Sequence, residues 1–249
     1  MRSTWEQLIA EFLGALALVF IGAGSVVVLA PQLAGQTAVL GIALAHALVL
    51  AVMVSNLGHI SGAHFNPAVT IGVWVAGKIE TPRAGMYIVA QLAGAAGGAG
   101  LLRLVIPREL WEVTSLGLTQ VSAALGFTTG KAALLEAILT FFLVFTVFAA
   151  AIDDRGVFKS VAGLTIGLVL GFDVLVGGLL TGASMNPARS FGPALVVWDW
   201  TNFWVYVIGP VTGAVAAASL YLFVFLRGRW VAAPRTETPI GAGPEEDLP

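Results

Sequence analysis

Two copies of the tripeptide Asn-Pro-Ala lie 120 residues apart, one formed by Asn66, Pro67 and Ala68 and the other by Asn186, Pro187 and Ala188. Proline suits the first turn of a helix and asparagine suits the position just before it. Each triplet therefore predicts a helix start with a side-chain amide at the positive end of the helix dipole. If the two starts meet, both amides can donate to one small polar molecule, and their positive potential repels cations.

The helices that these triplets begin, residues 66–76 and 186–198, are apolar but too short to cross a bilayer, which takes about 20 residues. Each follows a Gly/Ser/Thr-rich turn, residues 61–64 and 181–184. Irregular backbone is tolerated at membrane depth only inside protein or beside a water-filled cavity. The pattern therefore predicts two re-entrant half-helices and indicates a pore.

Four charged residues lie inside otherwise apolar stretches: Glu11, Glu136, Asp173 and Arg189. A charged side chain at the bilayer centre costs about 2.5 kcal/mol or more, so such a residue is a functional candidate by default. We expect Arg189 to line the pore rather than form a structural salt bridge. Asp173 either pairs with His46 or Arg189 in the pore or bonds to the backbone of an outer loop, and we favour the second.

Other chemistry is poorly supported. The chain has no Cys, and His59 and His64 lack a third ligand nearby, so we expect no metal site and no cofactor. No nucleophile or metal set accompanies Glu11 and Glu136, so we expect no enzyme. The net charge of −2 gives no reason to expect a nucleic-acid partner.

The elements that position these residues are membrane helices. Apolar residues make up 58% of the chain and charged residues only 10%, against about 25% charged in soluble domains. No Asp, Glu, Lys or Arg occurs from Phe12 to Gly77. We predict an all-α membrane protein with six spans, at residues 6–30, 37–57, 82–106, 130–152, 160–180 and 202–226.

The chain repeats itself, with Glu136 echoing Glu11 and residues 178–188 echoing 58–68. Three spans per repeat, about 5–106 and 130–228, require the second half to be inverted, and inverted repeats place their site near the midplane. One channel domain over 1–229 and a disordered tail over 230–249 follow. With both termini in the cytoplasm, basic residues lie mostly inside, which agrees with the positive-inside rule.

Residues 61–70 and 182–194 resemble the two signature loops of the aquaporins, or major intrinsic proteins, and the resemblance covers about residues 5–228. It implies a right-handed bundle, a homotetramer with one pore in each subunit, and passive flux of water with protons and ions excluded. It also implies that Glu11 and Glu136 bind loop N–H groups. The loop carbonyls that then face the pore are those of Gly62, Ala63, His64, Gly182, Ala183 and Ser184.

The same resemblance implies a narrow filter formed by His46, Val174, Ala183 and Arg189. Val174 and Ala183 are small, so we expect a wider filter than in strict water channels, with two polar donors at His46 and Arg189. This set is similar to the tonoplast and nodulin-26-like branches, which include channels for ammonia, urea, glycerol or metalloid acids. Ser190, Ala194 and Tyr206 resemble water channels rather than glycerol channels, and Val207 matches neither.

We therefore expect a passive channel in a lipid bilayer, for water and also for small uncharged solutes. The alternatives are a main physiological role in ammonia, urea, glycerol or metalloid acid permeation and, more remotely, a coupled transporter, an intramembrane enzyme or a non-conducting adhesion protein. The short loops and tail favour a bacterial or archaeal plasma membrane.

Overall fold

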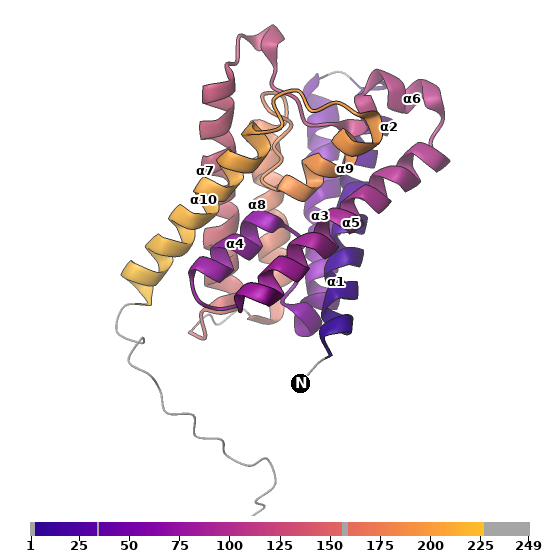
Figure 1. Ribbon diagram of the computed structural model, residues 1–249. Coiled ribbons are helices and arrows are strands. Elements are labelled where there is room, and N and C mark those ends of the chain that lie inside the picture. Colours follow the sequence, from indigo (N-terminus) through magenta and orange to yellow (C-terminus); the bar gives the residue numbers. More distant parts are fainter. Residues whose placement is uncertain (1–2, 34, 156–158, 227–249) are drawn as a thin grey trace, which may run out of the picture.

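The computed structural model describes residues 3–33, 35–155 and 159–226 (Figure 1). Within these ranges, six helices are long and apolar enough to cross a membrane: Thr4–Leu29, Thr37–Ser61, Thr81–Val105, Thr129–Ile152, Lys159–Gly177 and Val205–Phe225. The predicted all-α membrane fold is confirmed. The tail expected to be disordered, residues 230–249, lies outside the described residues.

Three of the six spans contain a π-helical segment. Span 1 consists of α1 (Thr4–Ala17), the π-helical η1 (Leu18–Ala23) and α2 (Gly24–Leu29). Spans 2 and 3 are α3 (Gly35–Ser61) and α5 (Thr81–Val105). Span 4 joins α7 (Thr129–Val147) to η4 (Phe148–Ile152), and span 6 joins α10 (Val205–Leu220) to η6 (Tyr221–Phe225). Span 5 is α8 (Ala162–Gly177), preceded by the short η5 (Lys159–Val161).

The two predicted half-helices are α4 (Pro67–Val75) and α9 (Pro187–Val197), and both lie among the long helices in Figure 1. Asn66 and Asn186 are the N-caps, in extended backbone conformation, and each is followed by proline in the first turn. The expected boundaries are therefore confirmed to within a residue, because the cap residues mark them locally.

Small residues bring the helices close together. A Cβ added at Gly94 or Gly98 of α5 would overlap the backbone of span 1, and one at Gly213 of α10 would overlap the backbone of α7. α3 packs against α8 in the same way, through Gly163 and Gly167. Close backbone approach at small residues is typical of helix packing in membranes.

Each half-helix packs against the third span of the other half. Gly72 of α4 faces Ala214 of α10, and Gly192 of α9 faces the backbone of Ala95 in α5. These two contacts join the two halves of the chain, and they bring the two Asn-Pro-Ala turns together between the halves.

Three boundaries differ by three residues or more from those predicted. Span 2 ends at Ser61 rather than at residue 57, span 5 ends at Gly177 rather than at residue 180, and α10 begins at Val205 rather than at residue 202. Asn202 has a left-handed φ of 55°, and its carbonyl closes a turn with the N–H of Val205, so the helix starts later. The short α6 (Arg108–Val113), between spans 3 and 4, was not predicted.

Candidate functional site

The two Asn-Pro-Ala turns are joined by reciprocal hydrogen bonds. Asn66 Nδ2 donates to the carbonyl of Met185 at 2.8 Å, and Asn186 Nδ2 donates to the carbonyl of Phe65 at 3.0 Å. Each Oδ1 caps its own helix, accepting from Ala68 N at 2.8 Å and from Ala188 N at 2.9 Å. A primary amide carries two N–H groups. Each asparagine therefore keeps one N–H for a molecule passing between the helix ends.

The backbone of both turns has the same unusual conformation. Left-handed φ angles occur at Gly62, Ala63 and Phe65 in the first turn, and at Gly182, Ala183 and Met185 in the second. Such angles are rare for residues other than glycine and persist only where the surroundings enforce them.

Two buried glutamates provide that enforcement. Glu11 accepts hydrogen bonds from the backbone N–H groups of His64 at 3.0 Å and Phe65 at 2.7 Å, and also from Ser61 Oγ and Gln91 Nε2. Both glutamates are fully buried. Each carboxylate therefore draws the N–H groups of its turn to one side.

The second turn has the matching arrangement. Glu136 accepts from Ser184 N at 2.9 Å, Met185 N at 2.7 Å and Thr181 Oγ1 at 2.7 Å. Among the described residues, no hydrogen bond reaches the carbonyls of the six positions expected to face the pore, Gly62, Ala63, His64, Gly182, Ala183 and Ser184. Those acceptors are available to a solute.

A narrow passage of about 20 Å³ runs through the centre. Its polar lining includes His46, Asn66, Asn186 and Arg189, and its apolar lining includes Leu18, Leu50, Phe65, Val69, Leu143, Ile166 and Leu170. One water needs about 10–15 Å³ on this measure, so the passage has room for roughly one water.

Larger cavities lie on either side of this central passage. The cavity on the side where α1 begins and η6 ends, here called the inner cavity, measures about 720 Å³ and is lined by His59, His64 and Lys78 among others. The outer cavity, on the opposite side, measures about 520 Å³ and is lined by Val174, Gly178 and Gly182 among others. The inner cavity shares His64 and Val147 with the central passage, and the outer cavity is lined by Gly117, whose carbonyl accepts from Arg189 of the passage. The three spaces therefore follow one another across the bundle.

His46 presents an acceptor rather than the expected donor. Its Nδ1 lies 2.9 Å from the carbonyl oxygen of Ile42. Because a carbonyl can only accept, Nδ1 carries the proton of the neutral ring and Nε2 is left with a lone pair. Nε2 is buried and has no partner in the part of the chain that is described.

Arg189 supplies the complementary group. Its Nη1 donates to the carbonyl of Gly117 at 2.7 Å, while its buried Nε has no partner among the described side chains and backbone. His46 and Arg189 therefore offer an acceptor and donors in one lining. Of the other two expected filter residues, Val174 lines the outer cavity and Ala183 packs beside Gly177.

The segment before α7 also contacts this site, which the sequence did not reveal. Besides the Gly117 carbonyl on Arg189, Thr119 Oγ1 lies 2.6 Å from Ser190 Oγ, which lies 2.7 Å from Ser184 Oγ. A chain of buried hydroxyls thus ties this segment to the second turn. Only the run of left-handed φ angles at residues 115–117 marks the segment as unusual, and no local sequence motif predicts it.

Asp173 does not make the contacts expected of it. It is only 1% exposed, and neither carboxylate oxygen has a hydrogen-bond partner among the described residues. The expected bond to an outer-loop backbone is therefore wrong, and no ion pair joins Asp173 to His46 or Arg189 within the described ranges.

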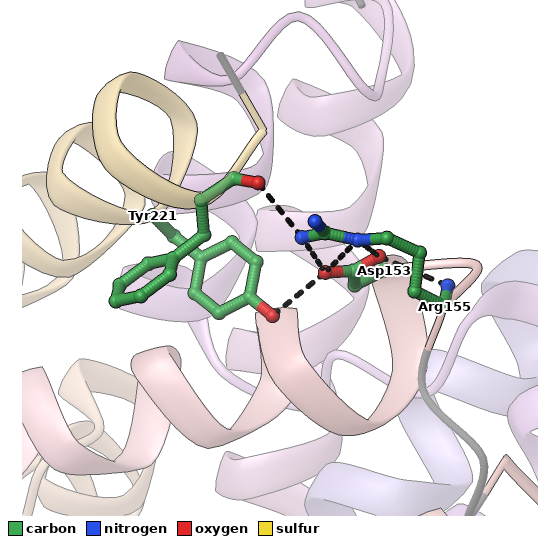
Figure 2. A network of polar contacts seen from close by, with 4 residues as sticks. Asp153, Arg155 and Tyr221 are labelled. Atoms are coloured by element: carbon green, nitrogen blue, oxygen red, sulfur yellow. Dashed lines mark hydrogen bonds and ion pairs between the residues drawn. The ribbon is translucent and has the colours of Figure 1, made fainter.

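A second polar network closes the inner ends of spans 4 and 6 (Figure 2). The buried Asp153 carboxylate accepts from the Arg155 guanidinium at 2.6 Å and from Tyr221 Oη at 3.0 Å. Arg155 Nη2 also donates to the carbonyl of Phe225 at 2.7 Å. The Arg155 guanidinium holds the pKa of the Asp153 carboxyl well below its usual range.

The two histidines of the inner cavity do not form a metal centre with their neighbours. His64 Nδ1 lies 3.1 Å from Thr70 Oγ1, and its ring stacks edge-on against Tyr87. Among the residues that the structure describes, no three His, Asp or Glu side chains are grouped so as to hold a metal ion.

Comparison with known proteins identifies relatives for the whole bundle. The family model described as Major intrinsic protein matches residues 1–221. "Aquaporin-4" of Mus musculus is 44% identical over 90% of this chain and 68% of its own length, and "Probable aquaporin TIP-type" of Medicago truncatula is 40% identical over 92% and 90%. The X-ray structure of the aquaglyceroporin from Plasmodium falciparum aligns with a TM-score of 0.79 at 25% identity, covering 90% of this chain and 97% of that one.

Proposed function

The chain belongs to the major intrinsic protein family and is a passive membrane channel for water and small neutral solutes, and we propose that its pore is the central passage between the outer and inner cavities. The observation that carries this proposal is the lining of that passage. It combines two asparagine amides and Arg189 with an apolar wall, in a space for roughly one water. A channel, rather than an enzyme, follows from the family.

We propose that the paired Asn66 and Asn186 orient each passing water. Their free N–H groups donate to its oxygen, which turns its hydrogens away along the passage. Such a water cannot accept a proton from a neighbour on either side, so the chain of waters is interrupted. The N-terminal dipole ends of α4 and α9, with the charge of Arg189, add a positive potential that repels hydronium and metal cations.

The apolar wall keeps transit fast. Leu50, Phe65 and Leu170 belong to this wall. An apolar wall gives few competing hydrogen bonds, so solutes bind weakly and leave quickly.

We propose that His46, Val174, Ala183 and Arg189 form the selectivity filter and that water is the main solute. The Arg189 guanidinium donates and the free loop carbonyls accept, so the filter suits a neutral molecule that can both donate and accept hydrogen bonds. Ammonia, urea, glycerol and metalloid acids fit this chemistry as further solutes. The free loop carbonyls of Gly62 to His64 and of Gly182 to Ser184 continue the row of acceptors on either side.

The assembly and membrane placement are proposed on separate grounds. The outer face of α3 exposes Leu40, Leu44, Leu48 and Val52, each more than half accessible, and such a face needs lipid or another subunit. A homotetramer satisfies this need. The distribution of basic residues supports cytoplasmic termini, and the short connections support a bacterial or archaeal plasma membrane, although the two relatives named above come from a mammal and a plant.

Stopped-flow light scattering on proteoliposomes tests the proposed function. Vesicles are challenged in parallel with sucrose, glycerol, urea and ammonium gradients. Fast shrinkage in every gradient supports water as the main solute, and fast re-swelling in glycerol or urea identifies additional ones. Flux equal to that of empty liposomes would contradict an open water channel.

A further inference from the structure

Span 1 reaches the central passage at three residues spaced four apart, one directly and two through side chains that they face. Leu18 lines the passage. On either side of it, a Cβ at Gly14 would overlap the ring of Phe65, and a Cβ at Gly22 would lie against the ring of His46. The two glycines therefore leave room for side chains that belong to the passage.

The contact at Gly22 is with the most consequential of these side chains. A Cβ there would lie 2.6 Å from His46 Nε2, 2.8 Å from Cδ2 and 3.2 Å from Cε1. Contacts below 3.0 Å require something to move. The tip of the imidazole thus occupies a recess in span 1 that exists only because residue 22 has no side chain.

The surroundings restrict where the ring could go if that recess were filled. Its Nδ1 is bonded to Ile42 in the same helix. The neighbouring flank of α3 is closed by α8, because Gly167 and Gly171 both pack against Ala47, the residue next to His46. A ring displaced from span 1 therefore moves toward the passage that it lines.

The helix geometry at this point is itself unusual. Gly22 lies within η1, where span 1 adopts the wider π-helical turn between residues 18 and 23. Such segments within α-helices are frequent at functional sites. Here the π-helical segment carries both Leu18 and Gly22, so it shapes the passage at two points.

We propose that Gly22 is a specificity-determining residue, because it provides the recess that keeps the His46 imidazole at the wall and so sets the width of the passage beside Arg189. This inference rests on the proposed function, in which His46 belongs to the filter. It makes the width depend on a residue of span 1 that is not among the four filter positions.

Four variants test it in proteoliposomes: Gly22→Ala, His46→Ala, the double variant, and Gly24→Ala as a matched control. A Cβ at Gly24 meets only the flexible end of Leu102, at 2.9 Å, in a cluster away from the passage. Water, urea and glycerol permeabilities are measured per reconstituted channel, and thermal unfolding reports whether each variant is folded.

Gly22→Ala should lower the urea and glycerol permeabilities relative to water by about tenfold, since forcing one methyl group into a packed site is costly enough for such a change. Gly24→Ala should leave the ratio unchanged. In the double variant the added methyl group meets no ring, so the ratio should return to that of His46→Ala.

The outcomes separate the two proposals. If His46→Ala changes solute selectivity but Gly22→Ala does not, the proposed role of Gly22 is wrong, whereas the assignment of His46 to the filter is retained. If His46→Ala changes nothing, the filter assignment itself fails. If Gly22→Ala blocks all flux, recovery in the double variant supports the recess, and no recovery overturns it.

Discussion

Replacing Glu136 by Gln should destabilise the protein and disorder its second re-entrant turn. The carboxylate accepts three hydrogen bonds: Oε1 takes Thr181 Oγ1 and Ser184 N, and Oε2 takes Met185 N. A glutamine has only one oxygen. Whichever way the amide is turned, its NH₂ group faces one of the two backbone N–H groups, and that buried donor loses its partner.

The cost follows from this geometry. A buried unsatisfied donor costs about 1–3 kcal/mol, and the bonds that remain lose the advantage of a charged acceptor, about 1 kcal/mol each. The total is about 3–5 kcal/mol. At about 2–4 °C per kcal/mol for a chain of this size, the unfolding temperature should fall by roughly 6–20 °C.

Glu11→Gln should behave similarly, because Glu11 holds two backbone N–H groups and a hydroxyl in the same way. The matched control is Glu109→Gln, the same chemical change at an exposed residue of α6. Thermal unfolding of the purified protein gives the stability, and stopped-flow water permeability gives the function. An unfolding temperature within about 2 °C of wild type, with full water flux, would refute the reasoning that the charge anchors the turn.

Three further outcomes are expected. Tyr221→Phe removes a hydroxyl bonded to Asp153 and should cost about 1–3 kcal/mol in thermal unfolding at pH 7, with wild-type filter selectivity. The pKa of Asp153 is depressed in the folded protein. The stability that its carboxylate contributes is therefore present above the usual pKa of about 3.9 and is lost as the pH falls below that value toward the folded pKa. The effect of Tyr221→Phe on the unfolding temperature should accordingly shrink in acid. Asp173→Leu removes a buried carboxyl that has no partner among the described residues, and it should leave the unfolding temperature unchanged or raise it, whereas a marked fall would show that an unseen partner exists. Ser190→Ala breaks the row of hydroxyl hydrogen bonds that joins Thr119 to Ser184. It should lower the free energy of unfolding by about 1–3 kcal/mol and alter the urea-to-water permeability ratio. An unchanged ratio would show that these hydroxyl groups do not position Arg189.

The features that the sequence predicted are those that local chemistry dictates. The long apolar runs give the spans, and the Asn-Pro pairs define the half-helix starts because capping and proline act within a single turn. The matching positions of Glu11 and Glu136 could be predicted from the sequence because the two halves of the chain repeat. The contacts of both glutamates could be foreseen only through the family resemblance.

The features that were missed depend on distant contacts. The Gly117 carbonyl reaches Arg189 across 72 residues, and Gly22 meets His46 between two different spans. Neither contact produces a local sequence pattern from which it could be predicted. The tautomer of His46 likewise follows from where its helix places the Ile42 carbonyl, not from the residue type.

The reciprocal bonds of Asn66 and Asn186 have a consequence for biosynthesis. They join residues 119 and 121 positions apart, so neither exists until the second half of the chain has entered the bilayer. A nascent chain with only its first three spans has one turn, held by Glu11, and no opposing helix end. The passage is therefore completed only after the second Asn-Pro-Ala turn has been inserted opposite the first.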